Sequence, residues 1–181
     1  SWEEMAEMQR RLNILWNVFR FPLPYMRMDE FDPDAVDVED AETELVDEWV
    51  LSRLQSVSQE MTEHMEEFEQ HKALDALLDF VVEDVSRFYV QTVRDRLWEE
   101  DDSSSKEAAY ATLYHVLEQV VTLFAPFSPF VAEEIYQNLT GDAGFDTVHM
   151  NDWPERSEFW HDEALEADVA AVRAAEEAGS N

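Results

Sequence analysis

Apolar residues recur at intervals of three and four along most of the chain, and the strict alternation typical of β-strands is almost absent. This spacing predicts helices over about residues 2–21, 41–68, 71–98, 104–124 and 129–139, and a last helix that begins near residue 160. The third and fourth of these helices carry apolar residues on more than one face, so we expect them at the centre. The pattern predicts an all-α fold, a bundle of about five to six helices.

Local signals indicate where several of these helices begin and end. The first helix should stop at Pro22-Leu-Pro24, because proline cannot continue a helix. The spacing of Ser104 and Glu107 matches a capping box, which would open the fourth helix. Residues 141–154 read as irregular, with a short extended piece at residues 147–149.

Composition narrows the class of protein. The chain has 181 residues with 43 Asp and Glu against 12 Lys and Arg, a formal net charge of −31. Aromatic residues make up 12% of it, which excludes a wholly disordered acidic chain. No apolar run reaches the roughly 20 residues that cross a bilayer, so we expect no membrane association. The absence of cysteine excludes disulfides, thiolate metal sites and a cysteine nucleophile.

The acidic residues are spread along the chain rather than gathered in one block. Only Lys72 and Lys106 are lysines, and the other ten cations are arginines. An acidic protein that binds a basic partner would more often show one concentrated acidic block. In molar salt the Debye length falls to roughly 3 Å, so the repulsion of a carboxylate-coated surface is largely screened. We therefore expect a cytoplasmic protein of a halophile.

The cations, unlike the acids, are concentrated. Residues 1–28 hold four arginines and three carboxylates, and residues 85–98 hold three arginines and one carboxylate, so these windows carry seven of the twelve cations. Both windows are rich in aromatic residues. Arginine suits planar contact with phosphates and bases, and aromatic faces suit unpaired bases. The alternative is that the aromatic residues belong to the core and the arginines pair with surplus carboxylates.

Catalytic and metal-binding patterns are absent from the sequence. Three glycines cannot form a glycine-rich phosphate loop, and neither lysine lies in a Walker-type setting. A di-iron bundle needs a Glu-x-x-His motif on each of two helices, and the chain has one, at Glu158 and His161. We therefore expect no catalytic residue, no metal site and no cofactor in this chain.

Four segments together resemble a known family. Residues 15–21, 47–54 and 125–136 follow in the order found in the α-helical anticodon-binding domain of class I aminoacyl-tRNA synthetases of the isoleucyl, valyl, leucyl and methionyl group. Residues 79–98 resemble the isoleucyl type of archaea and eukaryotes, with the valyl type as the alternative. The resemblance extends over about residues 10–154.

The resemblance implies that the chain is a non-catalytic piece of a larger, monomeric, ATP-dependent isoleucine-tRNA ligase. The HIGH-like and KMSKS-like motifs that hold ATP do not occur in it, so ATP and magnesium would belong to a catalytic domain elsewhere. Residues 1–154 would form the anticodon-binding domain, and residues 155–181 a linker and helix leading to a C-terminal region. The implied function is to bind the anticodon stem-loop and position the tRNA for aminoacylation.

The resemblance also implies six tRNA-binding residues in two groups, namely Trp16, Asn17 and Arg20, and Arg94, Arg96 and Trp98. In this interpretation Asn17 would hydrogen-bond a base edge, Arg20 would contact phosphate or base, and Trp98 would be a stacking platform. An alternative from another class is a helical module that docks a protein partner through its acidic face and has no RNA role.

Overall fold

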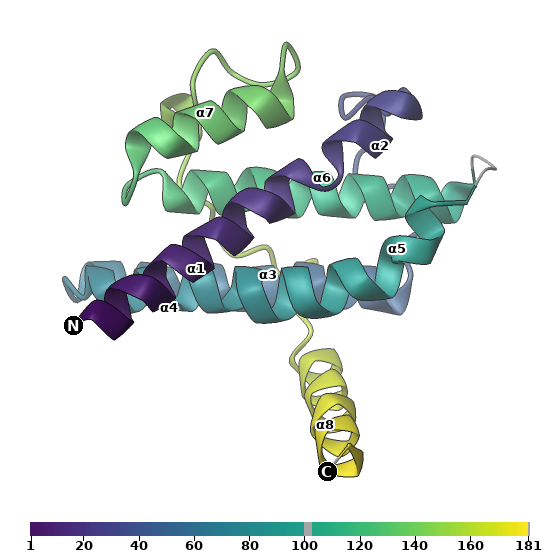
Figure 1. Ribbon diagram of the computed structural model, residues 1–181. Helices are drawn as coiled ribbons and strands as arrows, with labels where there is room; N and C mark the ends of the chain where they lie inside the picture. Colours follow the sequence, from purple (N-terminus) through teal and green to yellow (C-terminus); the bar gives the residue numbers. More distant parts are fainter. Residues whose placement is uncertain (100–102, 181) are drawn as a thin grey trace.

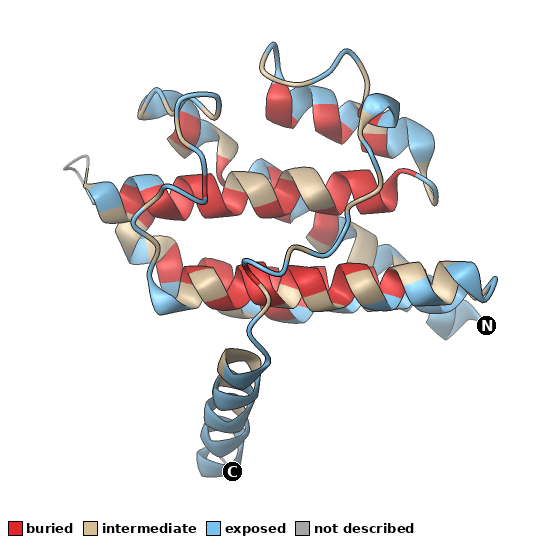
Figure 2. Cartoon of the chain, turned by 180° about the vertical axis from the view of Figure 1, so that it is seen from behind, coloured by how far each residue is buried: buried red, intermediate tan, exposed pale blue. Residues whose placement is uncertain are grey.

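Three long helical rods form the centre of the fold in the computed structural model, which describes residues 1–99 and 103–180 (Figure 1). They are α3 (Leu45–Glu66), α6 (Ser104–Phe124) and a continuous rod of α4 (Gln70–Asp79), η1 (Phe80–Val90) and α5 (Gln91–Leu97). Their facing sides carry most of the buried residues, which Figure 2 shows in red. The described residues contain no strand, and the predicted all-α fold is confirmed.

The remaining helices surround this centre. They are α1 (Trp2–Arg20), α2 (Leu23–Met28), α7 (Pro129–Thr140), the short 3-10 helix η2 (Val148–Met150) and α8 (Glu163–Gly179). Helix α1 crosses the front of the bundle in Figure 1 and packs against η1, α4, α2 and α7, while α7 packs on α6. The α4–η1–α5 rod and α6, which the sequence predicts to lie at the centre, are two of the three central rods. No helix of the described chain has the length and apolar character that a membrane crossing requires.

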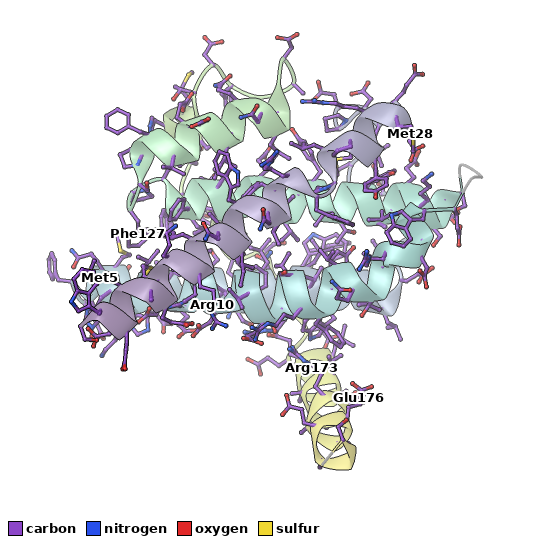
Figure 3. The ribbon with its side chains drawn as sticks, viewed as in Figure 1. Met5, Arg10, Met28, Phe127, Arg173 and Glu176 are labelled. Atoms are coloured by element: carbon purple, nitrogen blue, oxygen red, sulfur yellow. The ribbon has the colours of Figure 1, made fainter. Side chains whose placement is uncertain are left out.

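Helix α8 leaves the bundle at an angle and has no buried residue (Figures 1 and 2). Polar contacts attach it to the bundle: Arg173 Nη1 donates to Asp84 Oδ1 at 2.7 Å, and Arg53 Nη1 donates to Glu166 Oε1 at 2.8 Å. The guanidinium of Arg173 also lies over the Phe88 ring, 4.7 Å from its centroid. Figure 3 shows Arg173 where α8 meets the bundle and Glu176 farther out on the helix.

Three local predictions differ from the structure. Helix α1 ends at Arg20 as expected, but α2 begins at once, because a proline in the first helical turn has no N–H to lose and its fixed φ suits a helix start. The N-cap of α6 is Ser103, not Ser104, and its Oγ accepts from the Lys106 amide at 3.1 Å. Residues 148–150 form a 3-10 turn instead of an extended piece.

The third predicted helix is one rod, but its middle section η1 is a π-helix of 11 residues. Such wide turns are rare, and the apolar periodicity of the sequence does not announce them. Residues of η1 face α1 on one side and α3 on another. This double contact agrees with the apolar residues that occupy more than one face of this segment.

Candidate nucleic-acid interface

The last two turns of α1 separate a buried face from an exposed one. Leu15, Val18 and Phe19 are buried in the core. Asn17 and Arg20 are exposed and, being three residues apart, lie on the same face of the helix. The structure therefore brings together Asn17 and Arg20, the two residues of the Asn-x-x-Arg element, at the surface.

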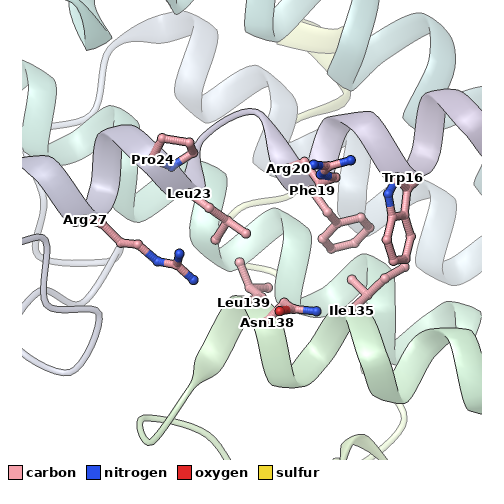
Figure 4. A pocket seen from close by; sticks show the side chains of 9 residues that line it. All are labelled: Trp16, Phe19, Arg20, Leu23, Pro24, Arg27, Ile135, Asn138 and Leu139. Carbon is pink, nitrogen blue, oxygen red and sulfur yellow. The ribbon is translucent and has the colours of Figure 1, made fainter.

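A pocket of about 520 Å³ opens between α1, α2 and α7 (Figure 4). It is lined by Trp16, Phe19, Arg20, Leu23, Pro24, Arg27, Ile135, Asn138 and Leu139. None of these lining residues is acidic, whereas each of four other pockets in the described part of the chain is lined by at least three carboxylates. Trp16 and Arg20 are among the residues predicted from the sequence, whereas Arg27 and Asn138 are not, because only the packing of α2 and α7 against α1 brings them to this place.

The C-terminal end of α5 carries an exposed cation–π pair. Trp98 is 46% exposed, and the guanidinium of Arg94 lies 4.6 Å from the centroid of its ring. Among the described residues, this guanidinium donates one hydrogen bond, to Gln91 Oε1 at 3.2 Å. Such a pair presents a flat aromatic face and a planar cation side by side, a combination that suits a base and its phosphate.

Arg96 faces the opposite way, because residues two positions apart do not share a helix face. Its Nη1 and Nη2 donate to the two carboxylate oxygens of Asp47 at 3.0 and 2.8 Å, and its Nε donates to Ser105 Oγ at 3.0 Å. The side chain of Arg96 is 12% exposed and that of Asp47 is fully buried. The structure thus separates Arg96 from Arg94 and Trp98 and uses its guanidinium to join α5 to α3 and α6.

Asp47 also accepts a hydrogen bond from the Tyr89 hydroxyl at 2.7 Å and one from the Glu44 amide at 2.9 Å. Burial raises the pKa of Tyr89 well above its ordinary value, and the charge and hydrogen bond of Asp47 raise it further. Tyr89 therefore remains a neutral donor, and the carboxylate of Asp47 is surrounded by donors without any water contact being needed.

Most cations of the two arginine-rich windows are neutralised by carboxylates. Ion pairs join Arg10 to Glu7, Arg11 to Asp75 and Asp79, Arg87 to Glu83, and Arg96 to Asp47. Nearby, Lys106 pairs with Asp29, and the hydrogen bonds from Lys106 and Tyr110 lower the pKa of that carboxyl group. For these residues the structure agrees with the alternative interpretation, in which the arginines of the two windows pair with surplus carboxylates.

Three arginines have no carboxylate partner among the described residues: Arg20, Arg27 and Arg94. They belong to the end of α1, to α2 and to α5, which converge on the same end of the bundle in Figures 1 and 2. We call the surface formed by Trp16, Asn17 and Trp98 with these three residues the arginine surface. In this surface the guanidinium charges are not neutralised by a described carboxylate, which favours contact with an anion.

One group of potential metal ligands lies away from this surface. At the α3–α4 turn, ligand atoms of His64, Glu67 and Glu69 lie within 4.8 Å of one another. Lys72 forms an ion pair with Glu69, and its hydrogen bond lowers the pKa of that carboxyl group. Because the ammonium group already occupies the carboxylate that a cation would need, we assign no metal to this group.

Comparison with known proteins identifies the class. Residues 47–180 match the family described as the anticodon-binding domain of tRNA ligase, and the chain belongs to this family. The whole chain also aligns with proteins named isoleucine–tRNA ligase, at 69% identity in Haloarcula marismortui, 66% in Natronomonas pharaonis and 60% in Halobacterium salinarum. It spans 17% to 18% of the length of these relatives. The family resemblance that the sequence motifs indicated is confirmed.

Proposed function

We propose that the chain is the anticodon-binding domain of an isoleucine–tRNA ligase and holds the anticodon stem-loop on the arginine surface. One observation carries this proposal: in a chain of net charge −31, the three arginines without a described carboxylate partner gather at one end of the bundle beside Trp16 and Trp98. Unpaired loop bases are recognised by stacking on aromatic or guanidinium planes and by hydrogen bonds to their edges. The arginine surface supplies aromatic planes (Trp16 and Trp98), guanidinium planes (Arg20, Arg27 and Arg94) and a hydrogen-bonding amide (Asn17).

High salt determines which of these contacts matter. The phosphate contribution to affinity comes from counterion release, with a log–log slope of about −0.9 per neutralised phosphate on duplex DNA, so it is small in molar salt. Stacking contributes about 1–3 kcal/mol per base and does not depend on counterion release. A halophilic domain would therefore gain little from additional lysines, and a few arginines beside aromatic rings suffice.

Arg96 contributes to this surface indirectly in our proposal. Its bonds to Asp47 and Ser105 fix the last turn of α5, on which Arg94 and Trp98 are mounted. We therefore treat Arg96 as a positioning residue for the tRNA contact. Asn17 and Arg20, which are exposed on α1, remain direct contacts in the proposal.

The activity of the parent protein belongs to the same proposal. The relatives are named as ligases of isoleucine and tRNA, and this chain spans less than a fifth of their length. Attachment of isoleucine to tRNA, with its need for ATP and magnesium, would take place outside the described residues. The parent would be a monomeric, cytoplasmic enzyme, and residues 155–181 would lead from the bundle to its next region.

Replacing Trp98 or Arg94 by Ala should weaken binding of an anticodon stem-loop RNA by about tenfold each in molar KCl. The reason is the loss of one stacking plane or one guanidinium, each worth on the order of 1–3 kcal/mol. Trp98 is half-exposed, and among the described residues the guanidinium of Arg94 forms one hydrogen bond, to Gln91, and a cation–π contact with the Trp98 ring. The fold should therefore be unaffected by either change. Fluorescence anisotropy of a labelled stem-loop, titrated with the 181-residue chain, measures the change.

Arg156→Ala is the matched control, because Arg156 is an exposed arginine that pairs with Glu158 on the tail side of the bundle. It should bind RNA as the unmodified chain does. Equal affinities for the control, Trp98→Ala and Arg94→Ala would show that the arginine surface does not hold the RNA. Absence of RNA binding by the unmodified chain, together with capture of a protein partner, would favour the acidic docking module instead.

A further inference from the structure

We propose that the pocket between α1, α2 and α7 is a separate subsite that takes one unpaired nucleotide of the bound RNA. Its phosphate would lie at Arg27, and its base would enter between Trp16 and Leu139, with Arg20 beside the indole at the other end of the pocket. The inference rests on the proposed function, since it assumes an RNA ligand, and deepens it by giving Arg27 of the arginine surface a specific contact and by adding Asn138 and Leu139 of α7.

The charge of the pocket selects an anion. Arg20 and Arg27 come from consecutive helices, both are exposed, and neither has a carboxylate partner among the described residues. Figure 4 shows the guanidinium of Arg27 directed from α2 toward α7, while Arg20 lies beside Trp16 at the other end of the pocket. No lining residue is acidic. In a chain with 43 carboxylates, a pocket of this kind repels cations and accepts a phosphate group.

The interior of the pocket suits a base. Phe19, Ile135 and Leu139 are 3%, 3% and 8% exposed and form an apolar floor, and the half-buried Trp16 stands at one wall. The volume of about 520 Å³ lies within the range of small-ligand pockets, roughly 300–1,000 Å³. A flat, mostly apolar ring with polar edges can therefore be received whole, with an indole face available for stacking.

Asn138 offers a hydrogen-bond acceptor that would orient a base in the pocket. Its side-chain Nδ2 donates to the Glu134 backbone oxygen at 2.8 Å, which orients the amide and leaves Oδ1 as an acceptor without a bond to a described residue. A base that presents an N–H donor on its edge matches this acceptor. The bound base should accordingly turn an N–H edge, rather than a carbonyl or ring-nitrogen acceptor, toward Asn138 on α7.

The pocket is distinct from the platform formed by Arg94 and Trp98. That platform belongs to α5, on the far side of α1 from α7, and none of its residues lines the pocket. Arg20 links the two places, since it lines the pocket and lies on the exposed face of α1 with Asn17. One RNA strand that passes over the end of α1 would thus meet two separate sites for bases.

The test uses the 181-residue chain and anticodon stem-loops in which 2-aminopurine replaces one loop base at a time, in molar KCl. One loop position should show a fluorescence change on binding that Trp16→Leu removes. Arg27→Gln should lower the affinity by about tenfold, the loss of one charge-assisted contact. Asn138→Leu should reduce the preference for the natural base at that position without changing the affinity for an abasic one.

Arg27→Gln retains the fold because the Arg27 side chain is exposed and has no described partner, so its result stands even if Trp16→Leu disturbs packing. If Arg94→Ala and Trp98→Ala weaken binding while Arg27→Gln and Asn138→Leu do not, the pocket is no nucleotide subsite, and the proposed function stands on the Arg94 and Trp98 end of the arginine surface. If no variant changes RNA binding, both fail. If the pocket variants abolish binding of an acidic peptide but not of RNA, its ligand is a protein segment and our inference is wrong.

Discussion

Asp47→Ala should lower the free energy of unfolding by about 3–5 kcal/mol, the usual cost of removing one partner of a buried ion pair. The carboxylate of Asp47 is fully buried and accepts from Arg96, from the Tyr89 hydroxyl and from the Glu44 amide. Its removal would leave the Arg96 guanidinium largely enclosed with no opposite charge beside it, apart from Glu44 at 3.5 Å. Urea unfolding in molar KCl, followed by circular dichroism, measures the change.

Two further variants identify the cause. Glu66→Ala removes an exposed acid from the same helix and should change stability by no more than about 0.5 kcal/mol. Asp47→Asn retains the shape and one acceptor but removes the charge, so its loss should be smaller than that of Asp47→Ala. A loss below about 1 kcal/mol for Asp47→Ala would mean that Arg96 is stabilised by Ser105 and solvent alone.

The same cluster shows what the sequence could not indicate. Arg94 and Arg96 look equivalent in the chain, since both lie in a basic, aromatic window at the end of a helix. Their spacing of two predicts that they face different sides, but which side is buried depends on Asp47, 49 residues away. An ion pair across that separation leaves no local signal. The grouping of both arginines as surface residues was therefore beyond what periodicity could resolve.

The fold was more predictable than the site. The helices α1, α3, α6 and α7 lie within a few residues of the segments that apolar spacing predicts, because burial of one stripe per helix is what holds such a bundle together. Helix α2 was missed because proline signals the end of one helix and the start of another in the same way. The π-helix η1 was missed because its apolar residues would cover several faces whether the segment were an α-helix or a π-helix.

The pocket between α1, α2 and α7 had no sequence signal of its own. Its two sides, residues 16–27 and 135–139, are more than 100 positions apart and meet only when α7 packs beside α1. The arginine-rich window over residues 1–28 includes Arg20 and Arg27, which line this pocket. It could not show that Arg10 and Arg11 are neutralised by carboxylates while Arg20 and Arg27 have no carboxylate partner among the residues that the structure describes.

The thermal midpoint of the chain should rise by about 10 °C or more as KCl is raised from the millimolar to the molar range. A net charge of −31 on 181 residues makes the compact state repel itself, and the Debye length falls from about 30 Å at 0.01 M to 3 Å at 1 M. Each kcal/mol recovered corresponds to about 2–4 °C for a chain of this size. Thermal scans by circular dichroism over a KCl series measure the shift.

Screening also weakens attraction, so the sign of the effect has to be weighed. The exposed ion pairs of Arg10 with Glu7 and Arg87 with Glu83 contribute about 0–1 kcal/mol each, and salt removes part of that. Repulsion acts among all the remaining carboxylates, which far outnumber these ion pairs, so its total is larger than the attraction that salt removes. Glu118 on α6 is an example of this repulsion: burial raises the pKa of its carboxyl group, and the nearby charge of Asp34 raises it further. Repulsion should therefore dominate, and salt should stabilise the fold.

A matched charge variant separates screening from other effects of salt. Asp34→Asn combined with Asp40→Asn removes two exposed charges and keeps side chains of nearly the same size and shape. Neither carboxylate forms a hydrogen bond or ion pair with a described residue. Because the variant repels itself less, it should melt higher than the unmodified chain in millimolar KCl and at nearly the same temperature in molar KCl. Midpoints that fall as KCl rises, or a variant that is no more stable at low salt, would show that the acidic coat is not adapted to a salt-rich solvent.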